Sequence, residues 1–207
     1  NPDVYTHVFE KAQVIYKLHI DGAYGGFVYP FSNQQSKINF SNPKISSITI
    51  DAHKMLQAPY GTGVFICRKG LIENVLTQEA EYVEGMDLTL CGSRSGSNAV
   101  AVWMILFTYG PHGWYEKVSI LQMRTEYLCK ELEKLGVDFY RHPYMNIVTV
   151  DAQFISKELE KKYDLVPQKH NDDNNWYKIV LMDHVEVEHL TNFIDDLKHH
   201  LYAEKTM

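Results

Sequence analysis

The sequence predicts an α/β fold in which a mostly parallel sheet with helices is followed by a small C-terminal α+β domain. Short apolar segments that end in glycine or polar residues alternate with helical patterns in the first half of the chain, as in proteins with parallel sheets. A long amphipathic helical pattern then starts at residue 114 and differs from the short apolar segments before it. We therefore divide the chain into two predicted domains, residues 1–110 and 111–207.

The first domain is predicted to contain a helix and three strands. Residues 1–16 have helical spacing, with an asparagine able to cap the start and a proline in the first turn. Apolar segments at residues 17–22, 45–51 and 61–70 have the length and boundaries of strands. This order favours a sheet whose strands are mostly buried.

The second domain is predicted to contain two long amphipathic helices with shorter elements between them. Residues 114–135 form the first helix, which Gly136 ends, and residues 186–201 form the last. Between them we expect a strand at 146–152, a charged helix at 156–164, a polar loop at 167–176 and a strand at 177–182.

Composition excludes several classes of protein. Hydrophobic residues make up 45% of the chain and charged residues 22%, which is ordinary for a globular protein. The net charge of −6 and the lack of a long basic run argue against nucleic acid or a membrane surface as partner. The three cysteines form no CxxC pair, which predicts a reducing, cytoplasmic compartment. The longest apolar run, residues 99–107, is shorter than the roughly 20 residues of a membrane span, so we expect a buried helix.

Polar residues occupy alternate positions at two predicted strand ends. His19 and Asp21 project to the same side of the first strand, as do Asp51 and His53 at the end of the second. Ligands of α/β sheets bind at such carboxyl ends. Either pair alone could be a set of hydrogen-bonded strand-end residues. Two such pairs, one followed directly by Lys54, favour a ligand site.

A metal ion and a planar cofactor are the two alternatives for this site. Histidine and aspartate could supply metal ligands, but a metal gives no role to Lys54 or to the small residues at 22–26. Pyridoxal phosphate requires a lysine, a carboxylate beside its ring nitrogen, a small residue under the ring and donors for its phosphate. Asp21 would keep the ring nitrogen protonated, and Ala23 could lie flat under the ring. We therefore predict pyridoxal phosphate and no metal.

Three segments then resemble a known family. "HIDGAYGGFVYPF" at 19–31, "SITIDAHKMLQAPYGTGVFICRKG" at 47–70 and "LCGSRSGSNAVAVW" at 90–103 are similar to the group II pyridoxal-phosphate-dependent amino-acid decarboxylases. The branch that matches best is the archaeal-type tyrosine/aspartate decarboxylases, with the sphingosine-phosphate lyases as more distant relatives. The resemblance implies the end of a fold type I large domain plus the small C-terminal domain. Since the family's sheet begins upstream of the first motif, we expect the chain to be the C-terminal half of a decarboxylase.

The resemblance also implies residue roles near the cofactor. Lys54 would form the internal aldimine, Asp21 would pair with the pyridine nitrogen, and Ala23 would pack on the ring. His53 would contact the phosphate. His19 would support the pocket without a direct role.

Three further residues receive roles from the resemblance. Tyr82 matches the mobile-loop tyrosine that protonates the α-carbon after carbon dioxide leaves, although an ordinary surface position suits it equally. Ser93 would reach the phosphate of the neighbouring subunit across a homodimer interface, and it could also cap the helix that follows. Lys178 stands where decarboxylases carry the arginine that binds the substrate carboxylate, and lysine lacks the planar fork of arginine.

The resemblance implies that the full-length protein is a cytoplasmic homodimer that decarboxylates an L-amino acid, aromatic or acidic, through the Lys54 aldimine and a quinonoid. The 207-residue chain alone is expected to be inactive. Two alternatives remain open. One is a carbon–carbon lyase of the sphingosine-phosphate lyase type, and the other is a non-catalytic half-chain that acts as a dimerisation unit.

Overall fold

The computed structural model describes residues 2–75, 94–170 and 173–204. The chain divides into two compact units, Asn1–Pro111 (unit 1) and His112–Met207 (unit 2). Among the described residues, no helix combines the length and the apolar character that crossing a membrane requires. Unit 1 contains α1 (Pro2–Lys11), β1 (Leu18–Asp21), η1 (Gly25–Phe27), α2 (Tyr29–Ser32), β2 (Ile45–Asp51), β3 (Gly63–Cys67), η2 (Ile72–Val75) and the first segment of α3 (Gly96–Leu135).

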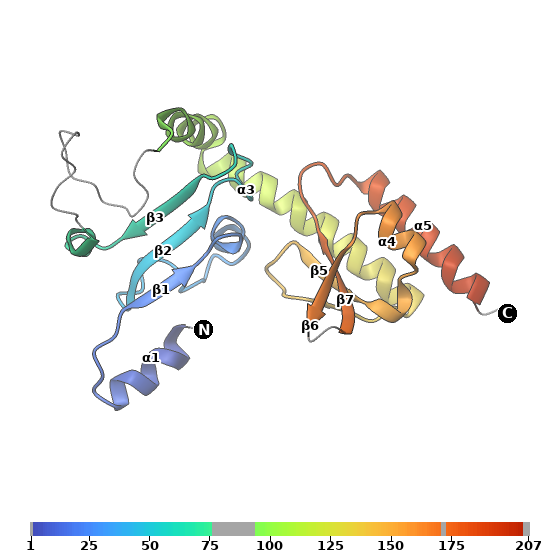
Figure 1. Cartoon of the computed structure of the whole chain (residues 1–207), viewed down its shortest axis with the longest axis horizontal. Coiled ribbons are helices and arrows are strands. Elements are labelled where there is room, and N and C mark those ends of the chain that lie inside the picture. The colour runs from blue at the N-terminus through green and yellow to red at the C-terminus, as the bar shows by residue number, and fades with distance from the viewer. Residues whose placement is uncertain (1, 76–93, 171–172, 205–207) are drawn as a thin grey trace. The chain divides into compact units, whose positions relative to one another are not determined.

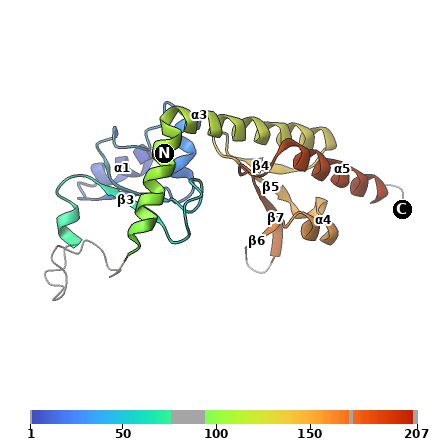
Figure 2. The ribbon, with the colours of Figure 1, turned by 90° about the horizontal axis from the view of Figure 1, so that it is seen from above.

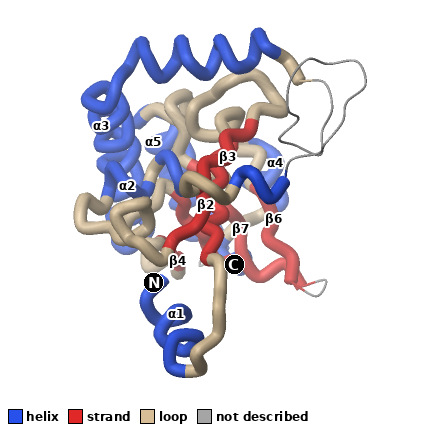
Figure 3. The backbone as a smooth tube through the Cα atoms, turned by 90° about the vertical axis from the view of Figure 1, so that its left-hand side faces the viewer, coloured by secondary structure: helices blue, strands red, loops and turns tan. Residues whose placement is uncertain are grey.

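Helix α1 is shorter than the sequence predicts. It ends at Lys11, and Gln13 adopts a left-handed backbone conformation with φ 54°, which an α-helix cannot continue through. Ile15, which helical spacing places on the apolar face of the predicted helix, is 95% exposed. An extended segment then leads from α1 to β1 (Figure 3). The prediction of a helix through residue 16 is therefore wrong beyond Lys11.

The sheet of unit 1 has the strand order β1-β2-β3 (Figure 1). Strand β1 pairs with β2 in parallel, and β3 pairs with β2 antiparallel. In this register Asp21 lies opposite Thr49, and Asp51 lies two residues further along β2. Side chains alternate between faces, so both aspartates project from the same face of the sheet. Most strand residues are partly exposed, which corrects the expectation of buried strands.

Helix α3 changes direction at Gly110, which has φ 58° and ψ −179° and is followed by Pro111. Glycine permits this conformation and proline cannot continue the hydrogen-bond ladder, so the two residues separate two helical segments. Residues 99–107 are helical as predicted. The prediction that they are buried is wrong, because Trp103 is 60% exposed and Phe107 75% exposed. Trp103 and Phe107 stack on each other, with 5.2 Å between ring centroids, but this contact leaves most of both side chains exposed.

Unit 2 packs helices against a four-stranded antiparallel sheet of order β4-β5-β7-β6. Helices α3 and α5 run side by side along it (Figure 2), and the Tyr127 hydroxyl lies 3.3 Å from Thr191 Oγ1 across them. Besides the second segment of α3, the unit contains β4 (Phe139–Arg141), β5 (Ile147–Asp151), η3 (Ala152–Phe154), α4 (Lys157–Lys162), β6 (Val166–His170), β7 (Asp173–Val180) and α5 (Val187–Glu204).

A continuous apolar core holds unit 2 together. Leu128 and Leu132 of α3, Val148 and Val150 of β5, and Leu197 of α5 are all fully buried in it. The predicted inward face of residues 114–135 is confirmed, and Gly136 follows the helix with φ 69°. Ser156 caps α4, its hydroxyl oxygen accepting a hydrogen bond from the Leu159 N–H at 3.2 Å.

The polar segment at 167–176 is not the loop that the sequence predicts. Most of it belongs to β6 and β7, which pair with each other, and β4 was not predicted at all. Cross-strand pairing satisfies the backbone groups of a polar segment whatever its composition, so the apolar alternation that would reveal a strand is absent here.

Candidate active site

The two polar motifs of unit 1 lie at adjacent strand ends. The Gly22 N–H donates to the Thr49 carbonyl at 2.9 Å, and the Asp51 N–H donates to the Ala23 carbonyl at 3.0 Å. A Cβ on Gly22 would lie 3.0 Å from the Thr49 carbonyl oxygen and 3.1 Å from the Gly26 Cα. The first turn can therefore approach β2 this closely only because it is built from glycine.

Asp21 presents an exposed carboxylate at the end of β1. Its Oδ1 accepts one hydrogen bond, from the Ala23 N–H at 3.1 Å. Among the described residues Asp21 has no cationic partner within ion-pair distance. The second oxygen remains available to an external donor, which is what a protonated ring nitrogen requires.

His53 is held in one orientation by its own turn. Its Nδ1 lies 2.9 Å from the Thr62 carbonyl oxygen. Because a carbonyl only accepts, Nδ1 carries the proton. The ring also packs against Tyr60, with 5.2 Å between centroids. The other ring nitrogen, Nε2, faces no backbone acceptor in this contact, and in the imidazolium form it carries a second proton that can be donated to an anion such as a phosphate.

Lys54 follows β2 in a tight turn. Its N–H donates to the Asp51 carbonyl at 3.1 Å, and its Nζ lies 2.8 Å from Asp51 Oδ2. The lysine side chain is 40% exposed. The sequence places Asp51 in one of the two polar pairs, but its pairing with Lys54 was not predicted.

The structure brings Asp21, Ala23, His53 and Lys54 together at one end of the unit 1 sheet. Their donor set fits pyridoxal phosphate: an amine, a carboxylate without a cation, a small side chain and an imidazole with one nitrogen engaged by backbone. Among the described residues, no group of three or more His, Cys, Asp or Glu side chains is placed to hold a metal ion.

His19 supports the same strands. Its Nδ1 lies 2.8 Å from Ser47 Oγ, its Nε2 lies 3.3 Å from Thr49 Oγ1, and its ring stacks on Phe65. Both ring nitrogens are thereby engaged with β2. These contacts anchor the ring to β2 and β3, and the supporting role of His19 at a cofactor site stays a prediction.

The remaining predicted residues are Tyr82, Ser93 and Lys178. Tyr82 and Ser93 fall outside the described residues. Lys178 is in β7 of unit 2, where it lines a cavity of about 490 Å³ together with His184 and His189.

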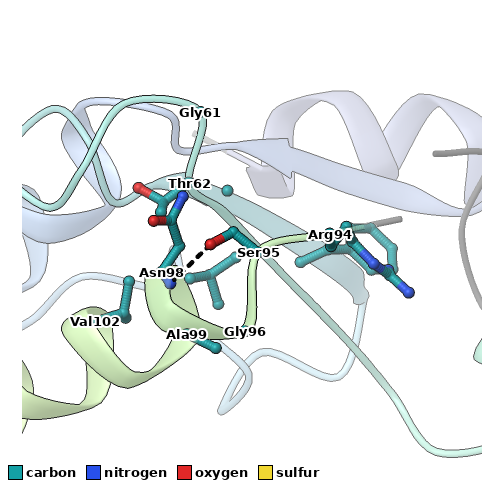
Figure 4. Close-up of a pocket in the computed structure, with 11 residues that line it drawn as sticks. Gly61, Thr62, Arg94, Ser95, Gly96, Asn98, Ala99 and Val102 are labelled. Carbon is teal, nitrogen blue, oxygen red and sulfur yellow. Dashed lines mark hydrogen bonds between the residues drawn. The ribbon is translucent and has the colours of Figure 1, made fainter. Parts of the chain in front are cut away.

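A second cavity, of about 740 Å³, lies within unit 1 between residues 61–65 and the start of α3 (Figure 4). Ser95 caps the helix there, because its Oγ accepts a hydrogen bond from the Asn98 N–H at 3.3 Å. Thr62, whose carbonyl orients His53, also lines this cavity. Thr62 was not predicted from the sequence. It acts through its backbone carbonyl, which every residue type has, so the residue type gives no signal.

Solved structures define the class of fold. Glutamate decarboxylase from Lactobacillus brevis superposes with a TM-score of 0.80 at 21% identity, over 97% of this chain and 50% of that one. Sphingosine-1-phosphate lyase from Burkholderia pseudomallei superposes with a TM-score of 0.75 at 17% identity, over 95% and 48%. The chain thus has the fold of the C-terminal portion of fold type I pyridoxal-phosphate enzymes.

Sequence comparison identifies the family. Residues 5–149 match the family described as "Pyridoxal-dependent decarboxylase conserved domain", and the chain belongs to that family. It is 55% identical over 207 residues to "Tryptophan decarboxylase" of Clostridium sporogenes, covering 98% of this chain and 50% of the relative. It is 33% identical to "Probable L-tyrosine/L-aspartate decarboxylase" of Methanococcus maripaludis, covering 87% and 49%. The chain therefore spans about half the length of these curated relatives.

Proposed function

We propose that the full-length protein containing this chain uses pyridoxal phosphate to decarboxylate an aromatic L-amino acid, tryptophan being the first substrate to test. The observation that carries the proposal is the grouping of Lys54, Asp21 and His53 at adjoining strand ends. The 55% identity to a protein named tryptophan decarboxylase supports the substrate class. The 33% identity to proteins named tyrosine/aspartate decarboxylase leaves an acidic substrate as the second choice.

Each residue at the site has a distinct task in this proposal. The Lys54 amine would hold the cofactor through its aldehyde carbon, the aldehyde oxygen leaving as water, and Ala23 would leave room for the flat ring. Asp21 accepts a hydrogen bond from the ring nitrogen, and its negative charge keeps that nitrogen protonated. His53, as the imidazolium, would donate to the phosphate through Nε2 while Nδ1 stays on the Thr62 carbonyl. Once bound, pyridoxal phosphate supplies an electron sink for the pair left on the α-carbon when carbon dioxide departs.

The remaining roles are proposed from the family resemblance. Tyr82 returns the proton to the α-carbon, Ser93 binds the phosphate held by the neighbouring subunit, and Lys178 attracts the substrate carboxylate. The full-length protein is proposed to be a cytoplasmic homodimer with shared active sites. Residues 1–110 would belong to the cofactor-binding large domain and residues 111–207 to the small C-terminal domain.

The lyase alternative has weaker support than decarboxylation. The relatives that share 55% and 33% identity are named decarboxylases. The likeness to the sphingosine-1-phosphate lyase, at 17% identity, supports a shared fold and not a shared reaction. We therefore propose decarboxylation alone.

Borohydride reduction of the purified full-length protein with pyridoxal phosphate tests the proposal. Peptide mass spectrometry should find the reduced cofactor on Lys54. Carbon dioxide release should then be measured with tryptophan, tyrosine, aspartate and glutamate, with Lys54→Ala as the inactive variant and Lys134→Ala as the surface-lysine control. A label elsewhere, or no carbon dioxide from any of the four amino acids, contradicts the proposal.

A further inference from the structure

Asp51 connects the two motifs of the candidate site through three contacts. Its N–H donates to the Ala23 carbonyl at 3.0 Å, and its carbonyl accepts from the Lys54 N–H at 3.1 Å. Its carboxylate then reaches the Lys54 Nζ at 2.8 Å. Because the backbone of Asp51 is fixed on both sides and the side chain is short, the position of the carboxylate is well defined.

Asp51 restrains a lysine side chain that would otherwise be flexible. Its side chain has four rotatable carbon–carbon bonds and is 40% exposed, so without a partner it would occupy many conformations in solvent. Asp51 is only 24% exposed, and a partly shielded carboxylate attracts an ammonium group more strongly than a fully solvated one does.

The two aspartates on this face of the sheet are therefore not equivalent. Asp21 has no cationic partner among the residues that the structure describes, whereas Asp51 is engaged by Lys54. An external cation such as a protonated ring nitrogen can pair with Asp21 without breaking an existing ion pair. At Asp51 it would have to displace the lysine.

We propose that Asp51 is the positioning residue for Lys54. Its charge holds the lysine nitrogen at the end of β2, on the face that carries Asp21, and this placement favours capture of the cofactor aldehyde. The inference rests on the proposed function, because it assigns Lys54 the role of binding the cofactor. Asp51 itself is not proposed to contact the cofactor.

The first experiment needs no cofactor. The purified full-length protein is labelled with a trace of acetic anhydride, and the modification of each lysine is measured by mass spectrometry. In Asp51→Asn, Lys54 should be labelled about two- to five-fold faster, the size expected when a partly exposed ion pair is lost. Asp51→Glu keeps the charge and should stay near the wild-type rate.

A matched control is available in unit 2. Glu131 and Lys134 have the same three-residue spacing, with 2.6 Å between Oε1 and Nζ, but belong to a helix of unit 2 and to neither motif. Glu131→Gln should change the labelling of Lys134 and leave Lys54 unaffected. Circular dichroism of each variant confirms that the fold is kept.

The second experiment measures cofactor capture. Borohydride trapping at limiting pyridoxal phosphate should fall about two- to five-fold in Asp51→Asn and recover in Asp51→Glu. Asp51→Glu keeps the charge, so equal losses in both variants would mean that charge alone does not position Lys54 and would overturn the proposal. An unchanged Asp51→Asn in either experiment also overturns it. If wild-type protein fails to capture the cofactor at Lys54, the proposed function fails, while anhydride labelling still decides whether Asp51 holds Lys54.

Discussion

Units 1 and 2 differ in the interactions that define their structure. Unit 2 has a continuous core of large buried side chains drawn from helices and strands. In unit 1 the buried apolar residues within the described ranges are mostly small or lie in turns, namely Val28, Ile45, Ala52, Met55, Leu56 and Ala58, while Trp103 and Phe107 are largely exposed. The candidate site nevertheless belongs to unit 1. Its geometry is set by backbone hydrogen bonds at strand ends, whereas the stability of unit 2 comes from packing.

The prediction with the largest expected effect tests whether the groups that decarboxylation requires are in unit 1. Asp21→Asn should lower decarboxylation by about 10²–10³-fold, the size seen when one preorganised electrostatic contact is removed, because a neutral amide cannot keep the ring nitrogen protonated. The variant should still fold and bind the cofactor at Lys54. Turnover is measured with occupancy confirmed by absorbance.

Unit 2 provides the matched control. Asp151 also ends a strand, and its Oδ1 accepts from the Gln153 N–H at 2.9 Å, as Asp21 does from the Ala23 N–H at 3.1 Å. Asp151→Asn should leave turnover near the wild-type rate. Wild-type turnover in a fully occupied Asp21→Asn protein would remove Asp21 from the proposed site.

The second prediction compares two leucines on the same helix. Leu132 is fully buried in unit 2 and Leu106 is 39% exposed in unit 1. In the 207-residue chain, Leu132→Ala should lower the free energy of unfolding by about 3 kcal/mol, since it opens a cavity in a packed core. Leu106→Ala should lower it by less than about 1 kcal/mol. Urea unfolding followed by Trp fluorescence measures both values, and equal losses would contradict the contrast between the units.

The third prediction concerns the close approach of backbone in unit 1. Gly22→Ala places a Cβ 3.0 Å from the Thr49 carbonyl oxygen, so the turn must move away from β2. We expect a loss of about 1–3 kcal/mol, as for other overpacked sites, and weaker capture of the cofactor. Gly96→Ala is the control, because a Cβ there has no atom within 4 Å and alanine favours a helix. Thermal unfolding of the full-length protein compares the two, and an unaffected Gly22→Ala would show that the turn tolerates displacement.

The smallest expected effect is electrostatic and lies in unit 2. Hydrogen bonds from Lys162 and Tyr163 hold the pKa of Asp196 below its ordinary value of 3.8. A lowered carboxyl pKa stabilises the folded state above that ordinary value, and the stabilisation is lost as the pH falls through the lowered pKa. Asp196→Asn should therefore lower stability by about 0.5–1 kcal/mol near pH 6, as expected for a partly exposed ion pair.

Urea unfolding of Asp196→Asn and wild type over a pH series checks this prediction. The difference between the two proteins should shrink as the pH drops below 3.8. A difference that stays constant with pH would mean that packing, not charge, explains the contribution of Asp196.

The sequence predicted the elements whose apolar periodicity was strong. The buried face of residues 114–135 and the end of that helix at Gly136 were both predicted correctly. The prediction failed for the β6–β7 hairpin. Its polar strands are held by backbone pairing and show no apolar alternation that would reveal them. The prediction failed also for the exposure of residues 99–107, because hydrophobicity indicates that a segment would be buried but not which surface covers it.

At the candidate site the sequence by itself determined the residue types and their order: a carboxylate and a small residue after one strand, then a histidine and a lysine after the next. Alternation along a strand was enough to place Asp21 and Asp51 on defined sides. Only the tertiary structure decided that the two strands are parallel neighbours, that the Thr62 carbonyl fixes the proton of His53, and that Lys54 pairs with Asp51 rather than Asp21. Register and backbone contacts bring residues together that lie far apart in the chain, and residue types alone do not encode those distances.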